Sequence, residues 1–296
     1  MRKRIFSLLL LWTWIWALTA GADSVAADRV SYLGPAGTYT EEATALWFTG
    51  GEMLIPRSTV NDALADLMDG EAEFAVIPQE NTIGGAVVNY VDALIGAENV
   101  YVVGEVILPI SQTLMGLPGA ALTDIGTVCS HAQGLAQSAR WRAEYLPDAV
   151  TQEMDSTAAA ARYVAETGDK TVAAVAAPGA AALYGLEVLA ENVQISMENK
   201  TRFYVLARTP LQGPDLRQAV LVATCEGSRI DDIVIGLHEI GLEFVAVHDR
   251  PEGSALGRYH FVIEIENPDG ITAEQIDAVR GLEGVRFAGC FNTISK

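Results

Sequence analysis

Cysteine is scarce in this chain, with only Cys129, Cys225 and Cys290 among 296 residues. So few thiols exclude the disulfide-rich framework of small secreted domains, and their wide spacing excludes a close-spaced cysteine zinc site. Cys129 is expected to be a small buried apolar residue. Cys225 and Cys290 fall in two expected strands of one small domain, so the sequence allows a disulfide between them but does not establish it.

Positive charge is also scarce: the chain has 19 Lys and Arg residues and 38 Asp and Glu residues, which give a formal net charge of −19. Such acidity argues against a nucleic acid or an anionic membrane as partner, since both are bound through clustered cations. An anionic small molecule would need a locally positive pocket. Half of the residues are hydrophobic, so the chain can build a full core and two domains.

The sequence lacks an apolar run of the length that a membrane span normally needs. Residues 1–4 (MRKR) are basic and residues 5–18 are apolar, short of the ~20 residues of a spanning helix. Small residues follow at 20–22 and 25–27, which completes the pattern of a secretory signal peptide. We expect a cleaved signal peptide at 1–27, a periplasmic or secreted mature protein and no membrane attachment after cleavage; an uncleaved anchor is the alternative.

Strand and helix patterns alternate from residue 28 to residue 208, which is typical of a mainly parallel α/β architecture. Expected strands cover 30–33, 74–78, 100–110, 126–129, 150–154 and 171–176, and expected helices cover 38–48, 61–68, 84–95, 132–145, 157–166 and 179–189. A linker with Gly and Pro follows at 209–217. Residues 218–296 then show the order β-α-β-β-α-β, which predicts a ferredoxin-like domain.

Polar residues gather in five short segments at the ends of expected strands. These segments are 34–39 (GPAGTY), 78–82 (PQENT), 130–133 (SHAQ), 155–157 (DST) and 199–203 (NKTRF). Open α/β sheets bind ligands at the carboxyl ends of their strands, so the five segments together favour one shared site. Glycines at 34–37 permit close backbone approach, and helix starts offer free N–H groups to an anion.

The segment 199–203 carries the most specific chemistry. Thr201 can donate a hydrogen bond to a departing oxygen. Arg202 carries a permanent, planar cation that suits carboxylates. The pair predicts an anionic substrate that loses an oxygen, although Thr-Arg at a strand edge is also an ordinary structural pair.

Four of the five segments resemble motifs of the prephenate dehydratase family, in its form with a C-terminal ACT domain. Residues 34–38 are similar to its Gly-Pro-x-Gly-Thr, 80–82 to its Glu-Asn-Ser, 130–133 to its Ser-His-Pro-Gln and 199–203 to its Asn-x-Thr-Arg-Phe. The resemblance extends from about residue 30 to the C-terminus. It implies a catalytic domain at 28–208 with two lobes, similar to type II periplasmic binding proteins, and an ACT domain at 218–296.

The resemblance implies decarboxylating dehydration of prephenate to phenylpyruvate, a step of phenylalanine biosynthesis, without a metal or organic cofactor. Aromatisation drives this reaction, so the enzyme mainly helps hydroxide to leave and desolvates a carboxylate. Thr201 would assist the departing hydroxide, and Arg202 would support Thr201, grip the pyruvyl carboxylate or brace the cleft. The residues expected to bind substrate are Thr38, Glu80, Asn81, Thr82, Ser130, His131, Gln133, Gln137, Ser156, Asn199 and Phe203.

The C-terminal segments that bind phenylalanine in the family depart from its pattern here. The family usually has Gly-Ala-Leu at the first helix start and Glu-Ser-Arg-Pro after the next strand. The corresponding residues are Ser228, Arg229 and Ile230, followed by His248, Asp249, Arg250 and Pro251. The Arg-Pro pair persists but the glycine does not, so an allosteric phenylalanine site and a purely dimerising domain are both open. A homodimer or larger oligomer is expected.

Three alternatives to this enzyme remain. An arogenate dehydratase acts on a substrate that differs by an amino group. An exported solute-binding protein would hold an aromatic or keto-acid ligand in the same two-lobed fold, and a regulatory sensor would keep the ACT domain beside an inert catalytic unit. The complete Thr201–Arg202 motif and the additional domain favour the enzyme. No segment resembling chorismate mutase precedes residue 28, so a monofunctional form is expected.

Overall fold

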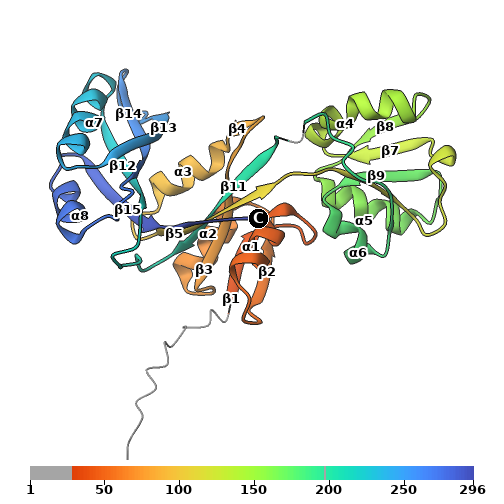
Figure 1. Cartoon of the computed structure of the whole chain (residues 1–296), viewed down its shortest axis with the longest axis horizontal. Coiled ribbons are helices and arrows are strands. Elements are labelled where there is room, and N and C mark those ends of the chain that lie inside the picture. The colour runs from red at the N-terminus through yellow and green to blue at the C-terminus, as the bar shows by residue number, and fades with distance from the viewer. Residues whose placement is uncertain (1–28, 197) are drawn as a thin grey trace, which may run out of the picture.

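A computed structural model describes residues 29–196 and 198–296 and contains three β-sheets with their helices (Figure 1). The expected signal peptide at 1–27 lies outside the described residues. Within the described part of the chain, no helix is long and apolar enough to cross a membrane.

The first lobe lies in the middle of Figure 1 and is built on a seven-stranded sheet in the order β16-β5-β11-β3-β1-β2, with β4 paired to β3. Its strands are β1 (Arg29–Leu33), β2 (Met53–Arg57), β3 (Phe74–Asn81), β4 (Gly85–Ala86), β5 (Tyr101–Pro109), β11 (Lys200–Ala207) and β16 (Thr293–Ser295). Its helices are α1 (Tyr39–Trp47), α2 (Val60–Asp69) and α3 (Val88–Gly96). β1 pairs with β2 and β3 in parallel, whereas β11 is antiparallel to both β3 and β5.

The second lobe, on the right of Figure 1, has a five-stranded sheet in the order β10-β6-β9-β7-β8. Its strands are β6 (Thr113–Gly116), β7 (Thr127–Ser130), β8 (Val150–Glu153), β9 (Val172–Ala176) and β10 (Glu187–Ala190). Its helices are α4 (Ala132–Tyr145), α5 (Thr157–Thr167) and α6 (Pro178–Tyr184), with a 3-10 turn at Leu122–Asp124. The chain enters this lobe after β5 and returns to the first lobe at β11, so both sheets are mixed rather than mainly parallel.

Two of the expected helices are shorter than the sequence pattern indicated. The expected helix at 84–95 begins only at Val88, because Gly85 and Ala86 first pair with β3 as β4. The expected helix at 179–189 ends at Tyr184, where Gly185 adopts a left-handed conformation with φ of 66° and closes the helix. The chain then forms β10, and β2 was not anticipated at all.

The C-terminal domain confirms the predicted β-α-β-β-α-β order. It contains β12 (Gln218–Glu226), a 3-10 turn (Gly227–Arg229), α7 (Ile230–Glu239), β13 (Glu243–Pro251), β14 (Arg258–Glu266), α8 (Ala273–Arg280) and β15 (Val285–Phe291). Its sheet has the order β13-β14-β12-β15 and is antiparallel throughout. One face packs on α7 and α8, on the far left of Figure 1. The other face shares a hydrophobic core with the first lobe, in which Val222 and Val262 join Leu94 and Tyr204.

The last residues of the chain leave the C-terminal domain and return to the first lobe. β16 pairs with β5 in parallel, with Thr293 opposite Glu105. Just before it, Gly289 has a φ of 125° and lies so close to the Val102 backbone that a Cβ at this position would collide with it. The unit expected at 218–296 therefore does not form a separate domain throughout, because its last residues belong to the seven-stranded sheet of the first lobe.

All three cysteines are buried and unpaired. Cys290 lies opposite Ala219 on the β12–β15 ladder, and Cys225 lies six residues further along β12. This is a separation of about 20 Å along the strand, which no disulfide can bridge. The possible bridge between Cys225 and Cys290 is therefore wrong, and burial raises the pKa of the Cys290 thiol to about 12.

Candidate active site

A cleft of about 300 Å³ lies between the two lobes, and all five polar segments identified in the sequence contribute to it. The residues that line it are Leu33, Thr38, Tyr39, Thr40, Pro78, Asn81, Ile110, Gln112, His131, Gln133, Gly134, Gln137, Asp155, Ser156, Thr157, Asn199, Thr201 and Phe203. Most of them carry neutral hydrogen-bonding groups. The shared site that the segments predicted is thus formed by residues that are up to 170 positions apart.

Three helices direct their N-termini into this cleft. Thr38 caps α1, His131 caps α4 and Ser156 caps α5, and each accepts a backbone N–H of its own first turn. Because the first N–H groups of a helix have no partner within it, a helix start carries a partial positive charge. Among the described residues that line the cleft there is no Lys or Arg. The locally positive pocket that this acidic chain requires therefore comes from helix ends.

Thr201 faces the cleft and is oriented by Asn81. The Asn81 Oδ1 accepts the backbone N–H groups of Ile83 and Gly84, each at 3.0 Å. Its Nδ2 therefore points the other way and donates to Thr201 Oγ1 at 2.9 Å and to Asn199 Oδ1 at 2.8 Å. With its oxygen accepting from Asn81, the hydroxyl of Thr201 keeps its own proton for a ligand in the cleft.

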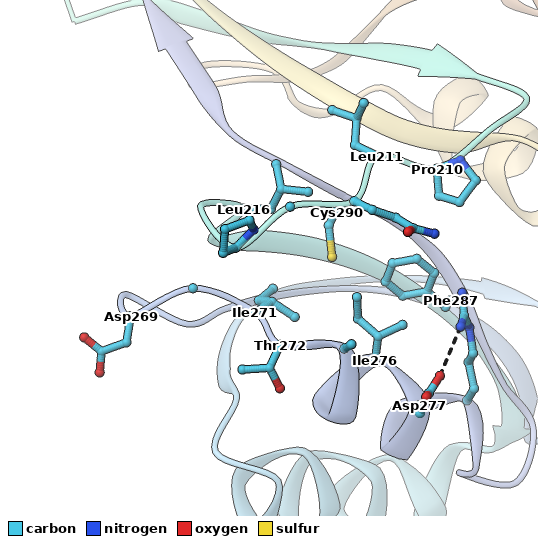
Figure 2. Close-up of a pocket in the computed structure, with 16 residues that line it drawn as sticks. Pro210, Leu211, Leu216, Asp269, Ile271, Thr272, Ile276, Asp277, Phe287 and Cys290 are labelled. Atoms are coloured by element: carbon cyan, nitrogen blue, oxygen red, sulfur yellow. Dashed lines mark hydrogen bonds and ion pairs between the residues drawn. The ribbon is translucent and has the colours of Figure 1, made fainter. Parts of the chain in front are cut away.

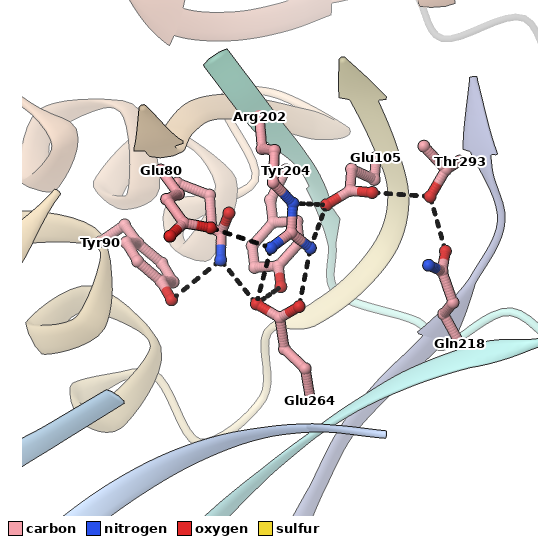
Figure 3. Close-up of polar contacts among 9 residues, drawn as sticks. Glu80, Tyr90, Glu105, Arg202, Tyr204, Gln218, Glu264 and Thr293 are labelled. Carbon is pink, nitrogen blue, oxygen red and sulfur yellow. Dashed lines mark hydrogen bonds and ion pairs between the residues drawn. The ribbon is translucent and has the colours of Figure 1, made fainter. Parts of the chain in front are cut away.

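Arg202 points to the opposite side of β11, because successive side chains of a strand alternate between its faces. Its Nε donates to Glu105 at 2.6 Å, its Nη2 to Glu264 at 2.7 Å and its Nη1 to Glu80 at 3.2 Å (Figure 3). Neither Arg202 nor Glu80 lines the cleft. Of the three roles considered for Arg202, the structure fits the brace, and it supports neither a grip on the substrate carboxylate nor substrate binding by Glu80.

The carboxylates around Arg202 are unusual for their burial. Glu105 is 1% exposed and Glu264 is 3% exposed. Burial raises the pKa of Glu105, although Arg202 and Thr293 act in the opposite direction. For Arg202, burial lowers the pKa, but the charges of Glu264 and Glu105 outweigh it and raise the pKa overall.

Two further residues predicted to bind substrate lie outside the cleft lining. Thr82 accepts the backbone N–H of Lys200 at 2.9 Å and donates to the Glu198 carbonyl, so it ties the β3 end to the segment before β11. Ser130 is fully buried and donates to the Val175 carbonyl at 2.6 Å, which joins β7 to β9. Both residues support the walls of the site.

Gln112 lines the cleft and was missed from the sequence. It lies on the crossing between β5 and β6, is 4% exposed and donates from Nε2 to Gln137 Oε1 at 3.1 Å. Its Oε1, like the Nδ2 of Asn199, has no hydrogen-bond partner among the described residues. A single glutamine between Ser111 and Thr113 gives no motif, and only its place at the crossing between lobes could have indicated it.

The C-terminal residues considered for phenylalanine binding lie away from the cleft. Arg229 forms ion pairs with Asp232 and Glu283 beside the start of α7. On β13, Arg250 binds Asp92 of α3 at 2.7 Å. The first segment follows the end of β12 and the second forms the end of β13, at the same end of the C-terminal sheet, and Arg250 contacts the first lobe there.

A separate cavity of about 570 Å³ lies between the linker and α8 (Figure 2). Leu211, Leu216 and Ile276 line its apolar part, and the ion pair between Arg280 and Asp277 lies at its edge. None of the residues predicted to act on substrate belongs to it. Its size therefore does not make it the catalytic site.

Fold and cleft together define a two-lobed α/β protein with a polar cleft between its lobes. The sequence model of the prephenate dehydratase family matches residues 30–211. The chain therefore belongs to the prephenate dehydratase family.

Individual relatives extend the similarity over nearly the whole described chain. The prephenate dehydratase of Amycolatopsis methanolica is 34% identical over 275 residues, which cover 89% of this chain and 88% of that protein. The structure of prephenate dehydratase in complex with L-Phe from Arthrobacter aurescens has a TM-score of 0.79 and 30% identity over 89% of each chain. A protein described as GqqA, a novel type of quorum quenching acylase, has a TM-score of 0.78 and 26% identity over 90% of this chain and 98% of its own.

Replacing Asn81 by Asp should lower kcat by about 100-fold, because a carboxylate cannot donate to Thr201 and adds a negative charge beside an anionic substrate. The measurement is the steady-state rate of phenylpyruvate formation from prephenate. Asn89→Asp on the exposed side of α3 makes the same chemical change away from the cleft and serves as control. Equal rates for Asn81→Asp and the control would contradict the role given to Asn81.

Proposed function

We propose that this chain converts prephenate to phenylpyruvate and that Thr201 assists the departure of hydroxide. The observation that carries the proposal is the placement of Thr201 in the interlobe cleft, where its oxygen accepts from Asn81 and its proton is free. Family membership supports the reaction, and the geometry supports the role of the hydroxyl.

The cleft suits a substrate that carries two carboxylates and one hydroxyl. The N-termini of α1, α4 and α5 supply partial positive charge from three directions. Gln112 and Asn199 also line the cleft, and each has one buried amide end without a hydrogen-bond partner among the described residues. Neutral donors hold an anion less tightly than Arg would, which favours loss of one carboxylate as carbon dioxide.

The reaction needs little from the protein once the substrate is oriented. As the bond from the ring to its carboxylate breaks, the electron pair enters the ring and the bond to the hydroxyl oxygen breaks in turn. Thr201 donates a hydrogen bond to that oxygen while negative charge develops on it, and the released hydroxide takes a proton from solvent to become water. Because this contact strengthens as the bond breaks, it lowers the barrier more than it strengthens substrate binding.

An acylase activity, as the GqqA name describes for that protein, is a poorer fit to this cleft. Acyl transfer requires a nucleophile with a base in hydrogen-bond reach. In the described cleft, the Nδ1 of His131 accepts the backbone N–H of Gln133, and Thr201 accepts from an amide. The hydroxyl of Thr201 is therefore arranged as a donor and lacks the activation of a nucleophile.

Thr201→Ala should lower kcat by about 100-fold or more, because the developing oxygen anion loses its donor. Thr201→Ser keeps the hydroxyl and should stay within about tenfold of wild type. Both variants are measured with prephenate, with arogenate in parallel to establish substrate preference. Full turnover by Thr201→Ala would exclude the proposed mechanism, and turnover confined to arogenate would change the substrate.

We propose that the C-terminal domain is an ACT domain that binds phenylalanine at Ser228–Ile230 and His248–Pro251 and joins two chains through β13. The relative from Arthrobacter aurescens was solved in complex with L-Phe. β13 is an edge strand, and Phe244, Val245 and Val247 are exposed on it. An exposed apolar edge strand is a ready pairing surface.

Sedimentation should accordingly give the mass of two chains, and calorimetry should detect phenylalanine binding. Val247→Glu should yield monomers, because it places charge in the paired edge. Val150→Glu alters an exposed valine on β8, in the second lobe, and should leave the dimer intact. A monomeric wild type would refute the edge pairing, and the absence of binding heat would refute the effector site.

We propose that the protein is exported and that a signal peptide within residues 1–27 is removed. The support is the basic, apolar and small-residue pattern of those residues. N-terminal sequencing of protein from the periplasm or medium should begin near residue 23 or 28. An intact Met1 would refute cleavage.

A further inference from the structure

Glu264 is a residue of the C-terminal domain whose carboxylate lies beneath the two strands that carry Asn81 and Thr201. Its Oε1 accepts from Gln79 Nε2 at 2.6 Å and from the Tyr204 hydroxyl at 2.9 Å, and its Oε2 accepts from Arg202 at 2.7 Å (Figure 3). Gln79 belongs to β3, whereas Tyr204 and Arg202 belong to β11. One buried side chain from β14 therefore ties together the two neighbouring strands of the first lobe.

The contact to Gln79 falls on an irregularity of the sheet. In the pairing of β3 with β11, Thr201 lies opposite Asn81, but the register shifts so that Gln79 is an extra residue without an opposite partner. Pro78 and Asn81 both line the cleft, while Gln79 and Glu80 both reach the Arg202 side. Regular alternation from Pro78 would turn Asn81 away from the cleft, so the bulge is what places it against Thr201.

The bulged residue is held by hydrogen bonds of its side chain and of its backbone carbonyl, which accepts from the Val87 N–H at 2.9 Å. Gln79 is 0% exposed, and its Nε2 donates to Glu264 and, at 3.2 Å, to the Tyr90 hydroxyl. A bulge leaves the ladder to β11 locally disrupted, so its side-chain contacts contribute to how well its position is defined. The shorter and charged contact is the one to Glu264, and hydrogen bonds to an ionised acceptor are the stronger kind.

We propose that Glu264 is a positioning residue of the dehydratase site, which acts by clamping the β3 bulge and Arg202 and thereby holds Asn81 against Thr201. The C-terminal domain then completes the catalytic geometry in addition to any role in regulation or assembly. The inference rests on the proposed role of Thr201. It predicts an effect on kcat rather than on KM, because the Thr201 contact strengthens in the transition state while the helix ends and amides of the cleft hold the ground state.

Glu264→Gln keeps the size of the side chain and leaves Arg202 paired with Glu105 and Glu80. It should lower kcat by about tenfold or more with KM within about threefold, because small misplacements of reacting groups have large effects on rate. Gln79→Met removes the same contact from the β3 side and should likewise lower kcat with little change in KM. With two variants, the test remains decisive if one of them folds poorly. Steady-state rates with prephenate are the measurement.

The matched control is Asp92→Asn, which replaces the carboxylate of another ion pair between the C-terminal domain and the first lobe, the one with Arg250. It should leave kcat within about twofold of wild type, since Asp92 lies on α3 and not on β3 or β11. If Asp92→Asn lowers kcat as much as Glu264→Gln does, the loss comes from weaker packing of the C-terminal domain on the first lobe, and the proposal is overturned. An unchanged kcat in Glu264→Gln would also overturn it.

The double variant Thr201→Ala with Glu264→Gln separates this inference from the mechanism on which it rests. If Glu264 acts through Thr201, adding Glu264→Gln to Thr201→Ala should change kcat by less than about twofold. An equal loss in both backgrounds would overturn the positioning role. Full activity of Thr201→Ala alone would instead overturn the role of Thr201, whatever Glu264→Gln does.

Discussion

The alternation of side chains along β11 is the constraint on which the rest of this structure depends. Thr201 faces the cleft between the lobes, and Arg202 beside it faces the C-terminal domain. One strand therefore contributes to the substrate site with one face and to the domain interface with the other. Because one peptide unit joins Arg202 to Thr201, the contacts that hold Arg202 also constrain the position of Thr201.

The charge distribution explains how an acidic chain can hold a dianion. The guanidinium of Arg202, next to the site, is already paired with Glu80, Glu105 and Glu264. It therefore adds little attraction for an anion in the cleft. The ends of α1, α4 and α5 supply positive potential in its place. Dipoles and amides orient an anion without the strong ion pair that would oppose decarboxylation, so a modest field is suited to this chemistry.

Local patterns in the sequence predicted the parts of the fold and site that depend on neighbouring residues. The helix starts at Thr38 and Ser156, the order of the C-terminal elements and the meeting of the five polar segments all follow from period, capping and strand-end rules. Thr201 was identified because a hydroxyl next to a cation is visible in one short segment. The main site and the C-terminal topology could thus be predicted from the sequence.

Features that depend on distant contacts were not predictable. Strand alternation turns Arg202 away from the cleft, but its partner Glu264 lies 62 residues away on another domain. The bulge at Gln79 has no local signature, and it alone turns Asn81 toward the cleft. Gln112 belongs to no motif, and it reaches the cleft because it lies where the chain crosses between the lobes. In each case tertiary packing supplied what local pattern could not.

The return of β16 to the first lobe has a topological consequence. The C-terminal domain is an insertion between two strands of one sheet, β11 before it and β16 after it, on either side of β5. Both of its ends are fixed, so it behaves as a closed loop of the catalytic unit instead of a pendant module. A chain cut after residue 211 would lose β16, an edge strand of the seven-stranded sheet, together with the C-terminal domain. A change in its activity could therefore come from the damaged sheet as well as from lost regulation.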